Sequence, residues 1–151
     1  MSGRRALVLG GGGAARAVAR SLAVAGARVT VAARRAEAAA DAAALAGGDA
    51  IEWNDRGSAA STAQILVNAT PVGMGGDSSL PIPADALGPE LVVVDLVYEP
   101  LETPLLEAAR HAGAATVSGL GMLVHQAALQ VELWSGRPAP IDAMRAAVSR
   151  V

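Results

Sequence analysis

A glycine-rich stretch directly after the first apolar segment constrains the fold of this chain more than any other feature. The run Ala6–Leu9 leads into Gly10–Gly13, Ala14 and Ala15, so Gly10, Gly12 and Ala15 match the pattern G-x-G-x-x-A. In that pattern the first glycine permits a tight strand-to-helix turn and the second lets a pyrophosphate approach the backbone, while the alanine lets the helix pack closely on the sheet. The N–H groups at the start of the helix favour phosphate. The stretch therefore predicts a phosphate-binding turn between a strand and a helix.

Short β-branched runs alternate with alanine-rich stretches along the whole chain. The predicted strands are Ala6–Leu9, Arg28–Ala32, Gln64–Val67, Leu91–Val94 and Ala115–Val117, with Ile51–Trp53 as a weaker sixth. The predicted helices are Ala14–Ala25, Ala36–Ala46, Pro104–His111 with Thr103 as its N-cap, Met122–Trp134 and Ile141–Arg150. Apolar strands without polar alternation are typical of a parallel sheet that helices cover on both faces.

We therefore expect one domain over residues 1–151, with a three-layer, doubly wound α/β fold of the Rossmann type. Its six-stranded sheet should be mostly parallel, in the order 3-2-1-4-5-6. The stretch Pro71–Pro89 is rich in Gly, Pro and Ser, and a loop of that length inside a compact domain is usually functional or disordered.

Composition excludes several classes of function. The chain has 151 residues, of which 52% are hydrophobic and 17% charged, so it is not a disordered chain. It has no cysteine, two isolated histidines that make a metal site improbable, and a net charge of −2 that gives no pull toward nucleic acid. No apolar run could span a bilayer and none resembles a secretory signal, so we expect a cytoplasmic protein. All 12 basic residues are arginine, so no lysine can act in catalysis.

The residues after the second predicted strand favour one dinucleotide over the other. An NAD site usually places Asp or Glu there to bind the ribose 2′-hydroxyl, whereas this chain has Ala33, Arg34 and Arg35. Two guanidinium groups suit the 2′-phosphate of NADP, which they can hold through forked hydrogen bonds. The alternative is that both arginines are solvated residues at a helix start, but positive charge there opposes the helix dipole. We therefore expect NADP.

Four motifs, in this order, resemble the C-terminal NADP-binding domain of shikimate dehydrogenase. They are Gly10–Ala17 (GGGGAARA), Asn68–Met74 (NATPVGM), Asp95–Pro100 (DLVYEP) with Thr103–Leu106, and Gly119–Gln126 (GLGMLVHQ). The similarity extends from about Arg5 to the end of the chain.

The resemblance implies roles for individual residues. The implied cofactor-binding residues are Gly10, Gly11, Gly12, Gly13 and Ala14 at the phosphate turn, Ala33, Arg34 and Arg35 at the adenosine side, and Asn68, Thr70, Leu96, Gly119 and Met122 along the crevice. Ala33 replaces an asparagine of the family. Tyr98 and Gln126 match residues that reach hydroxyl or carboxylate groups of shikimate, although each residue could instead be an ordinary surface or packing side chain.

The resembled enzymes have a second domain that binds shikimate and supplies a catalytic Lys–Asp pair, to which nothing in this chain corresponds. We therefore assign no catalytic residue here, and expect the NADP-binding half of an enzyme that reduces 3-dehydroshikimate to shikimate. It should be inactive without a substrate domain, which a separate chain could supply. The alternatives are a free-standing NADP(H)-binding or sensing module, or the cofactor half of a quinate or aminoshikimate dehydrogenase. Apolar residues of the last two helices, including Val131, Trp134 and Met144, predict an exposed patch and a homodimer.

Overall fold

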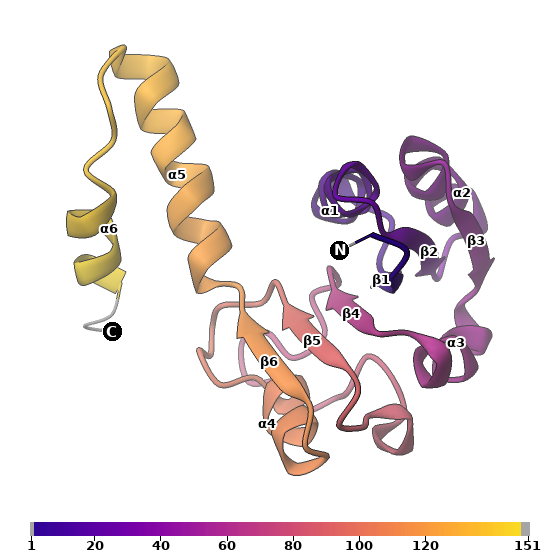
Figure 1. Ribbon diagram of the computed structural model, residues 1–151. Coiled ribbons are helices and arrows are strands. Elements are labelled where there is room, and N and C mark those ends of the chain that lie inside the picture. The colour runs from indigo at the N-terminus through magenta and orange to yellow at the C-terminus, as the bar shows by residue number, and fades with distance from the viewer. Residues whose placement is uncertain (1, 149–151) are drawn as a thin grey trace.

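Six parallel strands form a single sheet at the centre of the protein (Figure 1). The computed structural model describes residues 2–148. The sheet has the order β3-β2-β1-β4-β5-β6, and every adjacent pair of strands is parallel. The strands are β1 (Arg5–Leu9), β2 (Arg28–Ala33), β3 (Asp49–Glu52), β4 (Ile65–Asn68), β5 (Val92–Asp95) and β6 (Ala115–Ser118). The doubly wound topology predicted from the sequence is confirmed.

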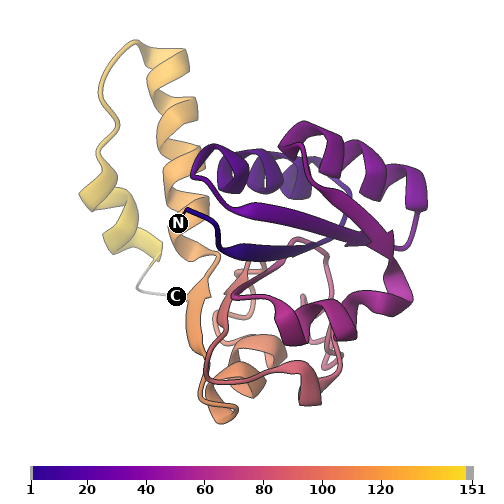
Figure 2. The same ribbon diagram turned by 45° about the vertical axis from the view of Figure 1, so that its right-hand side comes forward.

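Helices cover both faces of the sheet, as Figure 2 shows. Four of them pack on it: α1 (Gly13–Val24) and α2 (Ala36–Ala46) on one face, and α3 (Arg56–Thr62) and α4 (Pro104–His111) on the other. Two short 3-10 turns, η1 (Trp53–Asp55) and η2 (Ala84–Ala86), lie within the connections. Thr103 caps α4 as expected, since its side chain accepts a hydrogen bond from the Leu106 N–H.

Alternate residues of the central strands β1, β2 and β4 supply two separate cores. In β1, Ala6 and Val8 join the core under α1 and α2, whereas Leu7 and Leu9 join the core under α3 and α4. The first core is built largely from alanine, which lets α1 and α2 approach the sheet closely. The second contains larger side chains such as Leu105 and Leu106. Both faces of these central strands are therefore buried, which explains their continuous apolar character. The edge strands β3 and β6 contain only exposed and partly buried residues.

The structure differs from the sequence-based prediction in several places. Strand β3 spans Asp49–Glu52, whereas the sequence predicts Ile51–Trp53. Helix α3 was not predicted, because its sequence RGSAAST contains poor helix formers; it is held by burial of Ala60 and by hydroxyl bonds to preceding carbonyls. The long helix begins at Leu120, two residues before the predicted Met122. The segment Pro71–Pro89 is not a plain loop, since Ile82 and Leu87 are buried in the second core. The predicted end of the last helix, Arg150, lies outside the described residues.

The last two helices, α5 (Leu120–Ser135) and α6 (Ile141–Val148), form an antiparallel pair that extends beyond the β6 edge of the sheet (Figure 1). Helix α5 carries Leu129, Leu133 and Trp134, whose side chains are 67%, 82% and 78% exposed. Within residues 2–148, no helix combines the length and the apolar character that a membrane crossing requires. Of the residues from which an exposed patch was expected, Trp134 is exposed, whereas Val131 and Met144 are partly buried. Of the described residues of these two helices, the large exposed apolar side chains lie on α5 alone.

Candidate functional site

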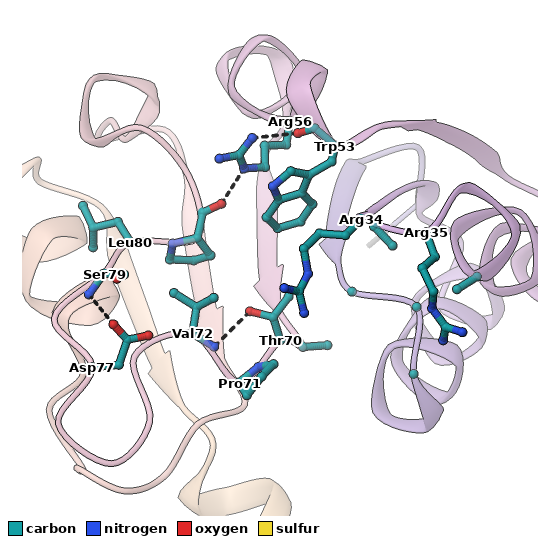
Figure 3. Close-up of a pocket in the computed structure, with 17 residues that line it drawn as sticks. Arg34, Arg35, Trp53, Arg56, Thr70, Pro71, Val72, Asp77, Ser79 and Leu80 are labelled. Atoms are coloured by element: carbon teal, nitrogen blue, oxygen red, sulfur yellow. Dashed lines mark hydrogen bonds between the residues drawn. The ribbon is translucent and has the colours of Figure 1, made fainter.

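A wide cleft of about 870 Å³ lies at the carboxyl ends of β1, β2 and β4 (Figure 3). In a doubly wound sheet, ligands bind at this edge, where the strand order reverses. The cleft combines the glycine turn, the residues after β2 and the loop after β4. Its lining consists of Gly10, Gly11, Gly12, Ala33, Arg34, Arg35, Ala38, Trp53, Arg56, Ala69, Thr70, Pro71, Val72, Asp77, Ser79, Leu80 and Pro81.

Each glycine of the turn has a different steric environment. Gly10 has φ +115°, and a Cβ there would lie 2.8 Å from the Ala69 carbonyl oxygen. A Cβ on Gly11 would lie 2.7 Å from both the Cβ and the carbonyl oxygen of Ala38. Around Gly12, by contrast, nothing lies within 4 Å of the added carbon. Close packing thus requires Gly10 and Gly11, whereas the space over Gly12 is open for a ligand.

Gly12 is also the N-cap of α1, and no side chain caps this helix. The first helical N–H groups therefore have no intrahelical partner and lie at the open side of the turn. No acidic residue occupies the first turn of α1. Oriented N–H donors, the helix dipole and open space together form a cradle that fits a pyrophosphate. Ala15, the last residue of the pattern, is fully buried and lets α1 pack on the sheet.

Arg34 and Arg35 follow β2 directly and both border the cleft. Arg34 extends across it in the direction of Thr70, whereas Arg35 points to the other side of the glycine turn (Figure 3). Both residues are exposed, while Ala33 is buried. Among the described lining residues, Asp77 is the one carboxylate; hydrogen bonds from Ser79 and the Gly73 N–H hold its pKa below the usual range. The cleft therefore carries a net positive charge suited to an anionic ligand.

A buried polar network joins the ends of β4 and β5. The Asp95 carboxylate accepts hydrogen bonds from Asn68 Nδ2 at 2.9 Å, the Val97 N–H at 3.0 Å and Thr103 Oγ1 at 2.7 Å. The side-chain oxygen Oδ1 of Asn68 accepts in turn from the N–H and the hydroxyl of Thr70. Burial raises the pKa of Asp95, although these three hydrogen bonds oppose the shift. The network holds in place the two loops that border the crevice. Asn68 is buried and does not line either cavity; it supports the loop through its hydrogen bonds.

A second, smaller cavity of about 270 Å³ adjoins the cleft on the β5 side and shares Ala69, Thr70 and Pro71 with it. Its other lining residues are Ala14, Met74, Leu96, Val97, Tyr98, Glu99 and Met122. Gly119 packs against its wall, since a Cβ there would lie only 2.5 Å from the Leu96 carbonyl oxygen. The structure therefore brings Thr70, Leu96, Tyr98 and Met122 together, with Gly119 directly behind them.

Gln126 lines neither cavity. It lies one helical turn beyond Met122 on α5, on the same face as Leu129 and Leu133, and is exposed. The neighbouring His125 faces the other way, because its Nε2 lies 3.1 Å from the guanidinium of Arg145 on α6. Gln126 thus belongs to the exposed apolar face of α5, next to the second cavity rather than inside it.

Trp53 and Arg56 line the cleft but are not among the site residues predicted from the sequence. The sequence predicts Trp53 inside a weak sixth strand, whereas strand β3 ends at Glu52 and Trp53 lies just past its carboxyl end. The position itself was a usable signal, since residues that follow parallel strands meet at the ligand-binding edge. Arg56 could not be found in this way, because it belongs to the unpredicted α3.

Two family models match the sequence, and together they account for most of the chain. One, described as NAD(P)-binding, matches residues 1–116. The other, the C-terminal domain of shikimate 5′-dehydrogenase, matches residues 119–148.

Curated relatives and solved structures give the same picture. The NADP(+) shikimate dehydrogenase of Halobacterium salinarum is 47% identical over 148 residues, which are 98% of this chain and 56% of that protein. A Thermus thermophilus shikimate 5-dehydrogenase, solved with NADP(H) and shikimate, has a TM-score of 0.84 and 41% identity over 96% of this chain and 54% of its own. A Corynebacterium glutamicum quinate dehydrogenase, solved with NAD, has a TM-score of 0.90 and 29% identity over 98% and 55%. The chain spans about half the length of the relatives it matches.

Proposed function

Since the chain belongs to the NAD(P)-binding family and corresponds to the C-terminal domain of shikimate dehydrogenases, we propose that it binds NADP(H) as the cofactor half of such an enzyme. The observation that carries this proposal is the joining of the glycine turn and Arg34 in one cleft. The complete reaction would be the reduction of 3-dehydroshikimate to shikimate by NADPH.

The cleft offers a distinct group to each part of the cofactor. The open N-terminus of α1 at Gly12 and Gly13 would bind the pyrophosphate, with Gly10, Gly11 and Ala14 shaping the turn. Arg34 and Arg35 would bind the 2′-phosphate that distinguishes NADP from NAD, beside the Ala33 backbone. When bound, NADP(H) supplies the hydride that is exchanged with a substrate carbon.

The second cavity would take the nicotinamide end. Leu96, Met122 and Thr70 border it, and Gly119 leaves room for the Leu96 backbone behind it. Asn68 would act by holding Thr70 in place. Tyr98 lines the same cavity and is 43% exposed, so its hydroxyl can reach a substrate bound above the nicotinamide. Gln126 would reach that substrate from α5.

Dehydrogenation of an alcohol also needs a group that accepts the hydroxyl proton. The chain contains no lysine, and its one histidine near the site, His125, faces α6. We therefore propose that the substrate and the proton acceptor are held by a substrate domain outside these 151 residues, and that the chain alone does not turn over shikimate. The exposed apolar face of α5, with Leu129 and Leu133, supports docking of further protein there.

We also propose that the chain forms a homodimer, which the same exposed side chains support, and that it works in the cytoplasm like the biosynthetic enzymes it resembles. A free-standing NADP(H)-binding module remains the second candidate, since the cofactor cleft is formed entirely by this chain.

A titration of the purified chain with NADPH and NADH, followed by an oxidation assay with shikimate and with quinate, tests the proposal. We expect NADPH to bind more tightly than NADH, with no turnover until a substrate-domain chain is added. Turnover of quinate rather than shikimate in the combined sample would assign the chain to a quinate dehydrogenase. Binding without turnover in any combination would favour the free-standing module, and no binding of either cofactor would contradict the proposal.

A further inference from the structure

Trp53 and Arg56 line the cleft at the end away from the helix α1 N-terminus, and neither has a part in the phosphate contacts proposed for the cofactor. Trp53 opens η1 directly after β3, and Arg56 opens α3. Both side chains are only partly buried. Trp53 packs against the second core while also bordering the cleft, so part of its indole remains available to a ligand.

The indole of Trp53 is held in place by Arg56. The guanidinium carbon lies 4.3 Å from the centroid of the ring, so a cation covers one face of the indole. Arg56 Nη1 also donates a hydrogen bond to the Trp53 carbonyl at 2.8 Å, and Arg56 Nε donates one to the Pro81 carbonyl at 2.7 Å (Figure 3). These contacts tie the end of β3 to the loop that follows β4. Because these contacts already hold the indole in place, a ligand that packs against it does not bear the entropic cost of ordering the side chain.

The position of Trp53 identifies the part of a dinucleotide that it would meet. The pyrophosphate site is at the N-terminus of α1, and the second cavity with Leu96 and Tyr98 lies on the β5 side of it. Strands β2 and β3 lie on the opposite side of β1, so the adenosine half of the ligand runs toward them. At that end Trp53, Leu80 and Pro81 give the cleft an apolar and aromatic surface, beside the guanidinium of Arg56. Such a surface suits a flat base rather than a phosphate.

We propose that Trp53 forms the wall against which the adenine ring of the dinucleotide packs, and that Arg56 is the positioning residue that holds this wall. The proposal rests on the proposed function, because it assumes a dinucleotide in the cleft. It adds a base-binding surface on η1 and α3 that is separate from Arg34, Arg35 and the glycine turn.

Tryptophan fluorescence tests this contact directly, because the chain has two tryptophans and Trp134 is 78% exposed on α5. In the variant Trp134→Phe, all tryptophan emission comes from Trp53. We expect adenosine 2′,5′-bisphosphate and NADP⁺ to change this emission in a saturable way, with the dissociation constant that calorimetry gives. Ribose 5-phosphate, which has no base, should leave the emission unchanged. In the matched variant Trp53→Phe, the remaining Trp134 emission should not respond to either nucleotide.

Binding constants of the Trp53 and Arg56 variants complete the test. Replacing Trp53 by Ala should weaken adenosine 2′,5′-bisphosphate about tenfold to hundredfold, and replacing it by Phe, which keeps an aromatic ring, should weaken it less. The Arg56→Ala variant should weaken the same ligand and red-shift the ligand-free Trp53 emission, a spectral change that loss of the Pro81 contact alone would not produce. If Trp53→Ala does not fold, Trp53→Phe and the Trp134→Phe titration still decide the question.

The outcomes separate this proposal from the proposed function. If calorimetry shows that NADP⁺ binds while Trp53 emission stays unchanged, or if Trp53→Ala binds as tightly as the wild type, the adenine wall is wrong and the cofactor function stands. If NADP⁺ does not bind to the wild type at all, both are wrong.

Discussion

Arg34 and Arg35 are neighbours in the sequence, yet their side chains leave β2 on different sides of the glycine turn (Figure 3). Arg34 extends across the cleft in the direction of Thr70, whereas Arg35 lies on the other side of the glycine turn, so the two guanidinium groups would meet a bound dinucleotide at different places. Two adjacent arginines are therefore expected to contribute unequally. The sequence alone predicts that both arginines follow the second strand. It does not predict on which side of the glycine turn each side chain lies, because that depends on the backbone at the start of α2.

Replacing Arg34 by Ala should weaken NADPH by about tenfold to hundredfold and leave NADH nearly unchanged, because a charge-assisted, forked contact to phosphate contributes about 1.5–3 kcal/mol. Calorimetric titration with each cofactor measures both values, and Arg35→Ala is the matched control with the smaller expected loss. Equal losses for NADPH and NADH in Arg34→Ala would mean that this residue positions the shared adenosine and does not read the phosphate.

The raised pKa of Asp95 leads us to expect that its contribution to the free energy of unfolding decreases as the pH rises. Burial raises its pKa, so the folded protein holds this proton more tightly than the unfolded chain does. Its contribution is therefore fully present below the ordinary aspartate pKa of about 3.9 and is lost as the pH rises through the raised value. We expect the free energy of unfolding of the wild type, minus that of Asp95→Asn, to decrease as the pH rises from about 3 to 7.

Urea unfolding at a series of pH values measures this difference. Asp77→Asn is the control with the opposite sign, because hydrogen bonds from Ser79 and Gly73 lower the pKa of Asp77 and its contribution is lost as the pH falls. A wild-type-minus-Asp95→Asn difference that rises with pH would show that the hydrogen bonds from Thr103, Val97 and Asn68 outweigh burial.

At the scale of single elements, the connection from β1 to α1 separates residues that serve the fold from residues that serve the ligand. Gly11 lies against Ala38 of α2, so a side chain there has no room. Gly12 lies only one residue further on and faces open space. The sequence pattern named Gly10 and Gly12 as special but did not reveal the contact of Gly11, because that contact depends on the packing of α2.

Exchanging these two glycines for alanine should therefore give opposite phenotypes. In Gly12→Ala the fold should be kept, with the unfolding free energy within ~1 kcal/mol of the wild type, while NADPH affinity falls at least about tenfold as the methyl group enters the pyrophosphate space. In Gly11→Ala the unfolding free energy should drop by about 1–3 kcal/mol through overpacking. Denaturant unfolding and NADPH titration of both variants measure this. Unchanged NADPH affinity in Gly12→Ala would contradict the proposed pyrophosphate site.

Helices and strands could be predicted from the sequence where an apolar pattern is bounded by a clear capping or turn residue. Strand β1 and helix α4 combine an apolar pattern with clear boundaries, such as the N-cap Thr103, and both have nearly the predicted limits. Helix α3 has a weak intrinsic helix propensity and is stabilised by burial of Ala60 in the second core. No local sequence pattern predicts this burial. The same limit applies to the site: the glycine turn is a local motif, whereas the Trp53–Arg56 pair depends on α3.

At the scale of the whole molecule, α5 and α6 contribute little to the two cores and present an apolar face to solvent. Val124 and Ala128 are the buried residues of α5, while Leu129, Leu133 and Trp134 are largely exposed. Side chains of this kind, grouped on one helix, usually mark an association surface. The sequence predicted exposed apolar residues on the last helices, but only Trp134 of the named residues is largely exposed, while Val131 and Met144 are partly buried. Which face of α5 is exposed, and its continuity with Gln126, depend on the direction in which α5 leaves β6.

Replacing Leu133 by Glu should reduce self-association without weakening the fold, since its side chain is 82% exposed and makes a small contribution to the folded state. Sedimentation velocity over a range of concentrations measures the mass, and thermal unfolding of dilute samples serves as the fold control. A wild-type chain that stays monomeric at high concentration would contradict the proposed homodimer. The α5 surface would then be left for a substrate domain alone.

The proposed NADP(H) site is the carboxyl edge of the sheet, between the glycine turn and Arg34. Backbone amide NMR shifts of the isotopically labelled chain, recorded during titration with NADP⁺, test it most directly. We predict the largest shifts at Gly11–Ala14, Arg34, Trp53 and Ala69–Val72, with small changes on α6. Saturable shifts confined to α5 and α6, or no shifts at millimolar NADP⁺, would show that this cleft is not the NADP(H) site.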